Sequence, residues 1–424
     1  MKLPALVLLL AGSLGAVPLT LQQALDEATK QSPDIQLARL RTAEAEARIA
    51  VVRAGLMPQA TLQIAGTYQT SNLQGIGLVF PGFPSRVGPY RTFDSRPRVT
   101  QSVLDFQLLS SIRTARARVG VASTQAEAVK EDLLVAVATA YFQALEAEAR
   151  VAAAEARLTT AEAILHQARD REATAIGSKL DIARAEQQAE TERGLVLQAQ
   201  QDTDTIKSLL LQLIGRPQTA LELTRPAEPN ETRDATALLA EAIAKRPGLR
   251  ALRQDLEVSR LEVETARREK LPKLTAFGDW GIAGAGPDRA LSTYAVGAAL
   301  TIPLWTGRRI EAEMALAAVR TDQVNAQLRK VQLEIEQQLR QALIERDSAR
   351  AQLQAAERAR AAAAQSLDLA RVRLETGLAT TVDVQVAQES VATADDTAIR
   401  SRFAVSLAST RLAWAAGDVR RAFR

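Results

Sequence analysis

The chain has 424 residues, of which 47% are apolar and 4% aromatic, and its 53 basic and 49 acidic side chains give a net charge of +4. Charges of both signs are interleaved, so no basic cluster with stacking aromatics indicates a nucleic-acid partner. So few aromatic residues favour thin helix–helix packing over a thick globular core. The sequence contains no cysteine, which excludes disulfides, thiolate metal sites, a cysteine nucleophile and an acyl anchor on an N-terminal cysteine.

Residues 1–16 have the pattern of a secretory signal peptide. Lys2 supplies a positive charge, an apolar run from Leu3 to Leu10 follows, and small residues predict cleavage after Gly15 or Ala16. The apolar run is too short to cross a bilayer. We therefore expect the mature chain to be exported.

The rest of the chain contains one pattern twice. Pro33 and Pro58 are followed, at the same spacing, by Pro247 and Pro272. After each proline pair come two alternating segments and a long Ala-rich stretch, which predicts a duplicated helix–strand–strand–helix unit. We place the first repeat at 17–215, a linker at 216–233, the second repeat at 234–416 and a solvated basic tail at 417–424.

Four segments alternate in polarity with a period of two and are predicted to be strands. We place them at about 59–70, 97–105, 273–282 and 293–304. In the last, Tyr294, Val296 and Leu300 share one face, opposite Thr293 and Thr301. An apolar face opposite a polar one is typical of membrane β-barrel strands, and a soluble two-sided sheet has the same period. Four strands cannot close a barrel, so membrane strands would have to come from several chains.

The connections between these strands are expected to be external loops. Residues 71–95 are rich in Gly, Pro and Ser and include Phe80 and Tyr90, which suits a long loop with interfacial aromatics. Residues 283–292 predict a shorter loop.

Two stretches without proline, 107–173 and 308–375, predict very long helices. At 1.5 Å per residue each could extend about 100 Å. Apolar residues such as Val324, Leu328 and Val331 recur at the steps of three and four found in coiled coils. Helices of this length need partner helices beside them.

Each long helix is predicted to end at a glycine-containing turn and to reverse into an antiparallel partner. Ser178 and Thr380 each precede an acid, Asp181 or Asp383, at the spacing of a capping box. The predicted partners are 179–214 and 381–416, so two helical hairpins turn at 175–178 and 377–380.

No catalytic, cofactor or metal-binding constellation is predicted. His166 is the only histidine, and no second imidazole or thiolate is available to complete a metal site. We expect it to face solvent or a tunnel. An enzyme is therefore not indicated.

As an ordered set, these features resemble the TolC family of outer-membrane efflux proteins. The resemblance covers about 19–416 and includes the strand end Leu300-Thr301-Ile302-Pro303-Leu304-Trp305, which leads into a helix. It implies a mainly helical homotrimer with a membrane β-barrel, four strands coming from each chain, and with a helical tunnel across the periplasm. It also implies a passive exit channel of a tripartite efflux or type I secretion system. Such a channel sits in outer-membrane lipid, docked on a periplasmic adaptor that is coupled to an inner-membrane pump.

The resemblance also assigns the two hairpin turns to adaptor contact, since small residues permit close end-on approach. The matching residues are Ala175, Ile176, Gly177 and Ser178 in the first turn and Gly377, Leu378, Ala379 and Thr380 in the second. Ala175 stands where the family prefers glycine. The alternative is that these residues are helix stops and caps.

Asp383 matches an acidic residue at the periplasmic mouth of the family's tunnel. Three-fold symmetry would bring three such carboxylates together, which attracts cations and raises the pKa of each carboxylate. The alternative is a cap shared with Thr380. Val386 stands where the family usually has a second acid, so a double constriction is not expected. For the whole chain, the alternative is an exported coiled-coil spacer of the cell envelope, which would not need the alternating strands.

Overall fold

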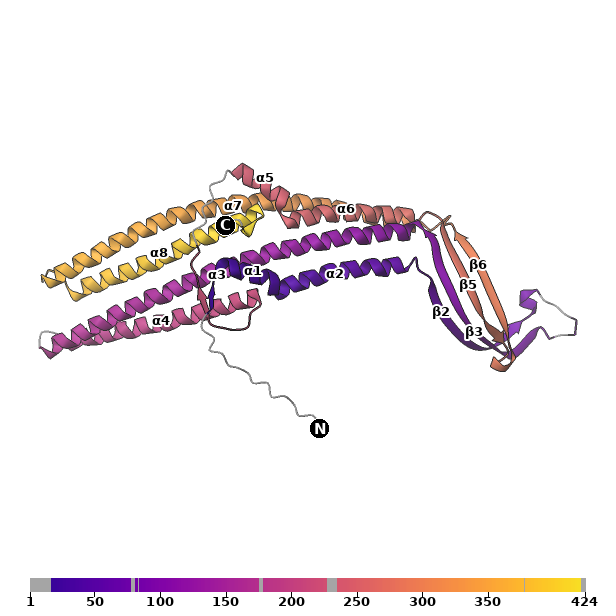
Figure 1. Cartoon of the computed structure of the whole chain (residues 1–424), viewed down its shortest axis with the longest axis horizontal. Helices are drawn as coiled ribbons and strands as arrows, with labels where there is room; N and C mark the ends of the chain where they lie inside the picture. The colour runs from indigo at the N-terminus through magenta and orange to yellow at the C-terminus, as the bar shows by residue number, and fades with distance from the viewer. Residues whose placement is uncertain are drawn as a thin grey trace, which may run out of the picture. The chain divides into compact units, whose positions relative to one another are not determined.

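A computed structural model describes residues 17–77, 81–82, 84–174, 178–226, 235–376 and 378–420 (Figure 1). The predicted signal peptide at 1–16 lies outside these residues. The chain divides into two compact units, and each unit combines segments from both repeats. Unit 1 comprises 1–40, 124–250 and 329–424, and unit 2 comprises 41–123 and 251–328.

The same order of elements occurs twice along the chain. The first half contains α1 (Leu21–Gln31), α2 (Pro33–Ala54), β2 (Gln59–Asn72), β3 (Arg86–Asp105), α3 (Phe106–Ala173) and α4 (Lys179–Ile214). The second contains α5 (Ala235–Lys245), α6 (Pro247–Arg268), β5 (Lys273–Gly284), β6 (Ala290–Thr301), α7 (Arg309–Glu375) and α8 (Thr381–Ala416). Short helices η1 (Gln74–Ile76) and η2 (Pro287–Arg289) lie between the paired strands. The predicted duplication is confirmed.

The repeated proline spacing has a local cause. Pro33 and Pro247 are the first residues of α2 and α6, where a missing backbone N–H costs no helical hydrogen bond. Both helices have 22 residues, and each is followed by a short turn and then Pro58 or Pro272 immediately before a strand. The two prolines of each pair therefore mark the start of a helix and the entry to the sheet.

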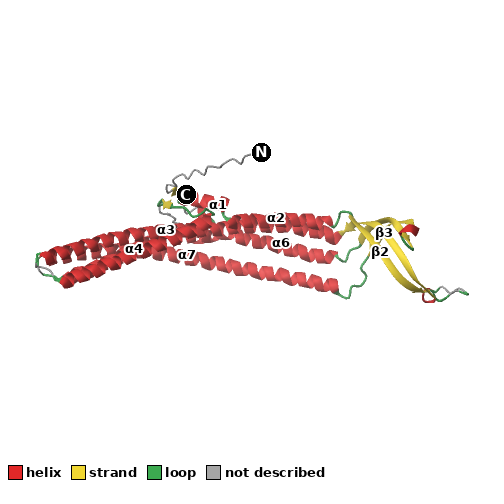
Figure 2. Ribbon diagram, turned by 90° about the horizontal axis from the view of Figure 1, so that it is seen from below, coloured by secondary structure: helices red, strands yellow, loops and turns green. Residues whose placement is uncertain are grey.

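Helices account for most of the described chain, and the longer strands form one sheet (Figure 2). That sheet belongs to unit 2 and is antiparallel, in the order β2-β3-β5-β6. β3 pairs with β5 and so joins the two repeats. Of the helices in the described part of the chain, none is long and apolar enough to cross a membrane.

The strand registers separate the sheet into an apolar and a polar face. The apolar face carries Leu62, Ile64, Tyr68, Val99, Trp280, Ile282, Tyr294, Val296 and Leu300. The polar face carries Thr61, Gln63, Thr67, Asp94, Arg96, Arg98, Asp279 and Thr293. The apolar side chains are exposed in the single chain, and Val296 retains 80% of its accessible surface. This is the alternation of barrel strands whose outer face meets lipid.

Two strands differ from the ranges predicted for them. β3 begins at Arg86 and not near 97, because the ladder with β2 continues as far as Asn72 opposite Arg86. The break at Gly88-Pro89 and a bulge between Gln69 and Ser71 hide this pairing in the sequence. Much of the predicted loop at 71–95 is therefore strand.

β6 covers Ala290–Thr301 in place of 293–304. Its first residue pairs with Gly284, so the connection to β5 is shorter than the predicted loop at 283–292. Pro303 has no N–H to donate to a ladder, and the strand ends before it.

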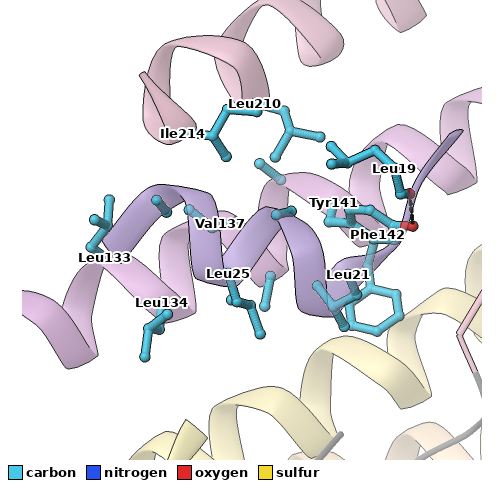
Figure 3. Packing of buried hydrophobic residues seen from close by; sticks show 14 of the residues in the cluster. Leu19, Leu21, Leu25, Leu133, Leu134, Val137, Tyr141, Phe142, Leu210 and Ile214 are labelled. Atoms are coloured by element: carbon cyan, nitrogen blue, oxygen red, sulfur yellow. Dashed lines mark hydrogen bonds between the residues drawn. The ribbon is translucent and has the colours of Figure 1, made fainter. Parts of the chain in front are cut away.

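The main core of unit 1 surrounds α1 and contains leucines from α1, α3 and α4, among them Leu25, Leu134 and Leu210 (Figure 3). Beside this core, β1 (Val17–Leu19) pairs in parallel with β4 (Leu221–Leu223), a strand within the predicted linker. The Tyr141 hydroxyl lies 2.8 Å from the carbonyl oxygen of Leu19 and 2.5 Å from that of Thr224. Burial raises the pKa of Tyr141 to about 12. The N-terminal strand is thus fixed to α3.

The start of the C-terminal tail is also packed. Val419 is fully buried, and its N–H donates to Glu131 at 3.4 Å. Arg420 forms an ion pair with Asp26 at 2.9 Å. The expectation of a solvated tail is therefore wrong as far as Arg420, because one apolar residue among the basic ones reaches the core.

Candidate functional site

The first hairpin turn ends in the predicted capping box. Ser178 has extended backbone angles, and its Oγ accepts a hydrogen bond from the N–H of Asp181 at 3.3 Å. In return, Oδ2 of Asp181 accepts from the backbone N–H of Ser178 at 3.3 Å and from its hydroxyl at 3.0 Å. The other predicted contact residues of this turn, Ala175, Ile176 and Gly177, lie outside the described residues.

The second hairpin turn has the same cap. Oγ1 of Thr380 accepts from the N–H of Asp383 at 3.3 Å, and Oδ2 of Asp383 accepts from the backbone N–H of Thr380 at 2.7 Å. The N–H groups of Leu378 and Ala379 donate to the carbonyl of Arg373 at 2.8 and 3.2 Å, which closes the end of α7. Leu378 is 71% exposed. Gly377 lies outside the described residues.

Asp383 acts as a cap in the single chain. Hydrogen bonds from the backbone N–H and then the hydroxyl of Thr380 hold the pKa of its carboxyl below the usual range, and the charge of Arg373 adds a smaller effect. Asp383 therefore forms the capping box that was considered as the alternative role, and Asp181 forms the matching one. Both bonds from Thr380 go to Oδ2, so Oδ1 of Asp383 accepts none of the cap's hydrogen bonds.

His166 lies on an exposed face of α3. Its Nδ1 is 2.9 Å from Oδ2 of Asp170, one turn further along the helix, and its side chain is 80% exposed. Within the described ranges, no group of three or more His, Asp or Glu side chains could hold a metal ion.

An ion-pair network that sequence reasoning missed connects the two hairpins. Arg157 on α3 lies 3.3 Å from Glu192 on α4 and 3.2 Å from Asp396 on α8. The antiparallel pairing of α3 with α4 brings Glu192 to Arg157, and the packing of one hairpin on the other brings Asp396 there. The predicted hairpins alone did not say which of their faces meet.

A second missed cluster lies on the polar face of the sheet. Arg96 on β3 reaches the buried carboxylate of Asp279 on β5 at 3.0 Å and Asp94 on its own strand at 2.7 Å. Arg98 contacts the other oxygen of Asp279 at 3.3 Å. Gly281 makes this possible, since a Cβ there would lie 2.4 Å from Cβ of Arg96. The position of Asp279 on the polar side of an alternating strand was the only sequence signal for this cluster.

Comparisons with known proteins agree with this architecture. Residues 24–216 and 238–418 match the model of a family described as "Outer membrane efflux protein". The chain is 25% identical over 406 residues to the pyoverdine export outer membrane protein OpmQ of Pseudomonas aeruginosa, covering 94% of this chain and 85% of that protein. It is 25% identical over 430 residues to the outer membrane efflux protein BepC of Brucella suis, covering 98% and 90%. It is 23% identical over 337 residues to the alkaline protease secretion protein AprF of Pseudomonas aeruginosa, covering 77% and 70%.

Solved structures share the fold. The Campylobacter jejuni CmeC outer membrane channel superposes with a TM-score of 0.78 at 16% identity, over 94% of this chain and 85% of that one. The Vibrio cholerae outer membrane protein VceC gives a TM-score of 0.71 at 21% identity, over 94% and 96%.

Proposed function

Because the chain belongs to the outer membrane efflux protein family, we propose that three copies of it assemble into one exit channel across the outer membrane. The chain is an outer-membrane channel with a helical body in the periplasm, and it is not an enzyme. The family works with adaptors and inner-membrane pumps in tripartite or type I systems. The alternative of an exported coiled-coil spacer of the cell envelope is therefore rejected.

The open sheet carries the proposal of a trimer. β2 and β6 are the two edges of a four-stranded sheet whose apolar face is exposed. Unpaired edge N–H and C=O groups are not tolerated against lipid, and four strands are too few to close a barrel. Pairing β6 of one copy with β2 of the next removes every edge, and three copies then enclose a channel lined by the polar face.

Introduced cysteines test this pairing, because the natural chain has none and only the added pair can form a disulfide. A series of full-length variants carries one cysteine at successive positions of β2 and a second at successive positions of β6. Each variant is tested in outer membranes. We expect a subset of pairs to give covalent dimers and trimers on denaturing gels. As a control, one cysteine is placed on β3, which already has two neighbours. A stable monomer by native mass spectrometry, with no cross-link from any β2–β6 pair, would overturn the proposal.

We also propose that the channel docks a periplasmic adaptor through its two hairpin turns, Ala175–Ser178 and Gly377–Thr380, and is thereby coupled to an inner-membrane pump. The exposed Leu378 and the two capped helix starts support this role, because a partner helix end can approach them closely. One relative is named for pyoverdine export and another for secretion of a protease, so the proposal covers both efflux and type I secretion.

At the periplasmic mouth, we propose that Asp383 contributes a ring of three carboxylates in addition to its cap. The support is its place in the first turn of α8, directly after the second hairpin turn. Val386 adds no second charge, and its side chain is exposed. A single ring favours cations over anions in the conducting path.

A further inference from the structure

Unit 1 contains a groove between the α3–α4 hairpin and the α7–α8 hairpin, which we call the hairpin groove. It consists of two adjoining cavities of about 490 and 470 Å³. Their linings share residues from all four helices, namely Ala161, Gln188, Arg371 and Gln385 among others. Each volume lies within the range of about 300–1,000 Å³ that is usual for small-molecule sites.

The cavity nearer the turns is lined in part by small and apolar residues. Ala161 and Ala185 are buried there, and Ile164 and Leu374 add larger apolar surface. Alanine at these positions leaves space that a leucine would fill. These residues therefore suit the apolar part of a ligand.

The same cavity is lined by three arginines that come from three helices. Arg171 belongs to α3, Arg184 to α4 and Arg371 to α7. Among the side chains that the structure describes, neither Arg171 nor Arg184 forms an ion pair, whereas the neighbouring Arg169 pairs with Glu186 at 2.7 Å. Guanidinium groups that lack a carboxylate partner leave a local excess of positive charge.

Asp181 is the single carboxylate among the described residues that line this cavity, and its Oδ2 already accepts two hydrogen bonds in the cap at Ser178. Gln167, Gln188, Gln385 and Gln388 also line this cavity, and each amide offers both N–H donors and an acceptor oxygen. The Nε2 of Gln188 already donates to Glu192 at 2.9 Å. The three arginines therefore give this cavity more hydrogen-bond donors than acceptors, beside its apolar lining residues. Arginine is the side chain best suited to hold carboxylate, sulfonate or phosphate groups through paired N–H bonds.

We propose that the cavity of the hairpin groove nearer the turns binds a small organic anion that combines an apolar ring system with a carboxylate, sulfonate or phosphate group. Arg171, Arg184 and Arg371 hold the anionic group, and the alanines and apolar side chains of the lining hold the ring. Because these arginines come from both hairpins, the bound anion joins α3 and α4 to α7. Asp383 is not among the described residues that line this cavity, so the anion site is separate from the carboxylate ring proposed above.

The test uses the full-length protein in lipid nanodiscs, with empty nanodiscs as the blank. Isothermal titration compares 1-naphthoate with its neutral analogue 1-naphthamide, which has nearly the same shape. We expect saturable binding of naphthoate at least tenfold tighter than that of the amide. Equal affinities for the two compounds would overturn the proposal.

Matched variants locate the site. Arg371→Gln and Arg184→Gln should each weaken naphthoate binding about five- to tenfold. Arg373→Gln, two residues along α7 and outside the described lining, should leave it unchanged. Arg371→Glu should reverse the preference, so that 1-naphthylmethylammonium binds more tightly than naphthoate. An equal loss in the Arg371 and Arg373 variants would also overturn the proposal. Native mass and single-channel conductance are recorded on the same samples, so failure to assemble or conduct is seen separately from failure to bind.

Discussion

The two hairpin turns have the same cap in different surroundings. Ser178 with Asp181 and Thr380 with Asp383 make the same reciprocal hydrogen bonds at the start of α4 and α8. Asp181 lines the hairpin groove, whereas Asp383 does not, although its neighbours Val382 and Val384 do. A capping box thus determines where a helix begins. It does not determine which surface the capping carboxylate lies beside. The two repeats therefore share the structure of the caps and differ in the surface that lies beside each cap.

The largest effect is expected from a bulky residue in the second turn. Replacing Gly377 with Trp should reduce export to the level of cells that lack the channel, because an indole blocks close approach of an adaptor. Trimer formation and outer-membrane insertion should remain, since the turn is distant in sequence from the strands. Export assays with membrane fractionation measure both.

The matched variant is Gly177→Trp in the first turn. Ala175 departs from the family pattern there, so we expect a smaller loss of export than for Gly377→Trp. Unchanged export in both variants, with normal amounts of protein in the outer membrane, would show that neither turn docks a partner.

A smaller effect is expected from removing the charge of Asp383. If three carboxylates face one axis, Asp383→Asn should weaken cation selectivity and block by multivalent cations in single-channel recordings. Asp181→Asn shares the cap and should leave both properties as they are. Small and equal effects from the two substitutions would identify Asp383 as a cap and nothing more.

Local signals predicted the helices and caps well because their causes lie within a few residues. The range 179–214 coincides with α4, where Ser178 begins the helix and Gly215 ends it with a positive φ of 78°. The contacts that distinguish the two turns have no such local cause. Arg96 meets Asp279 across 183 positions, and the hairpin groove combines residues of α3 with residues of α8. Pairing of this kind follows from which helix faces meet, and the Ala-rich helices present similar small residues on several faces.

The pH dependence of the second turn should distinguish the cap from the ring. The Thr380 hydrogen bonds lower the pKa of Asp383 in the folded chain, so the cap stabilises the turn above the ordinary aspartate pKa. That contribution is lost as the pH falls through the lower, folded pKa. A ring of like charges acts in the opposite direction and raises the pKa, which moves the loss to higher pH.

Hydrogen exchange of the α8 amides between pH 3 and 6 measures this. With the cap dominant, wild type and Asp383→Asn should differ near pH 6, and should converge only in the most acidic samples. Convergence well above the usual aspartate range would instead favour the ring. Asp181→Asn, followed through the α4 amides, gives the pH dependence expected when the carboxylate acts only as a cap.

The smallest effect is expected from the hydroxyls of the caps. Ser178→Ala and Thr380→Ala each remove the acceptor for an N–H in the first turn of α4 or α8, and loss of such a cap typically costs about 1 kcal/mol. We expect faster hydrogen exchange in that first turn alone, with the rest of the helix unchanged. If the turns differ only in their outward surfaces, the two substitutions should accelerate exchange by similar factors. A much larger effect of Thr380→Ala would mean that the second cap is also coupled to contacts between the three copies, because the three hydrogen bonds of the cap are the same at both helix starts.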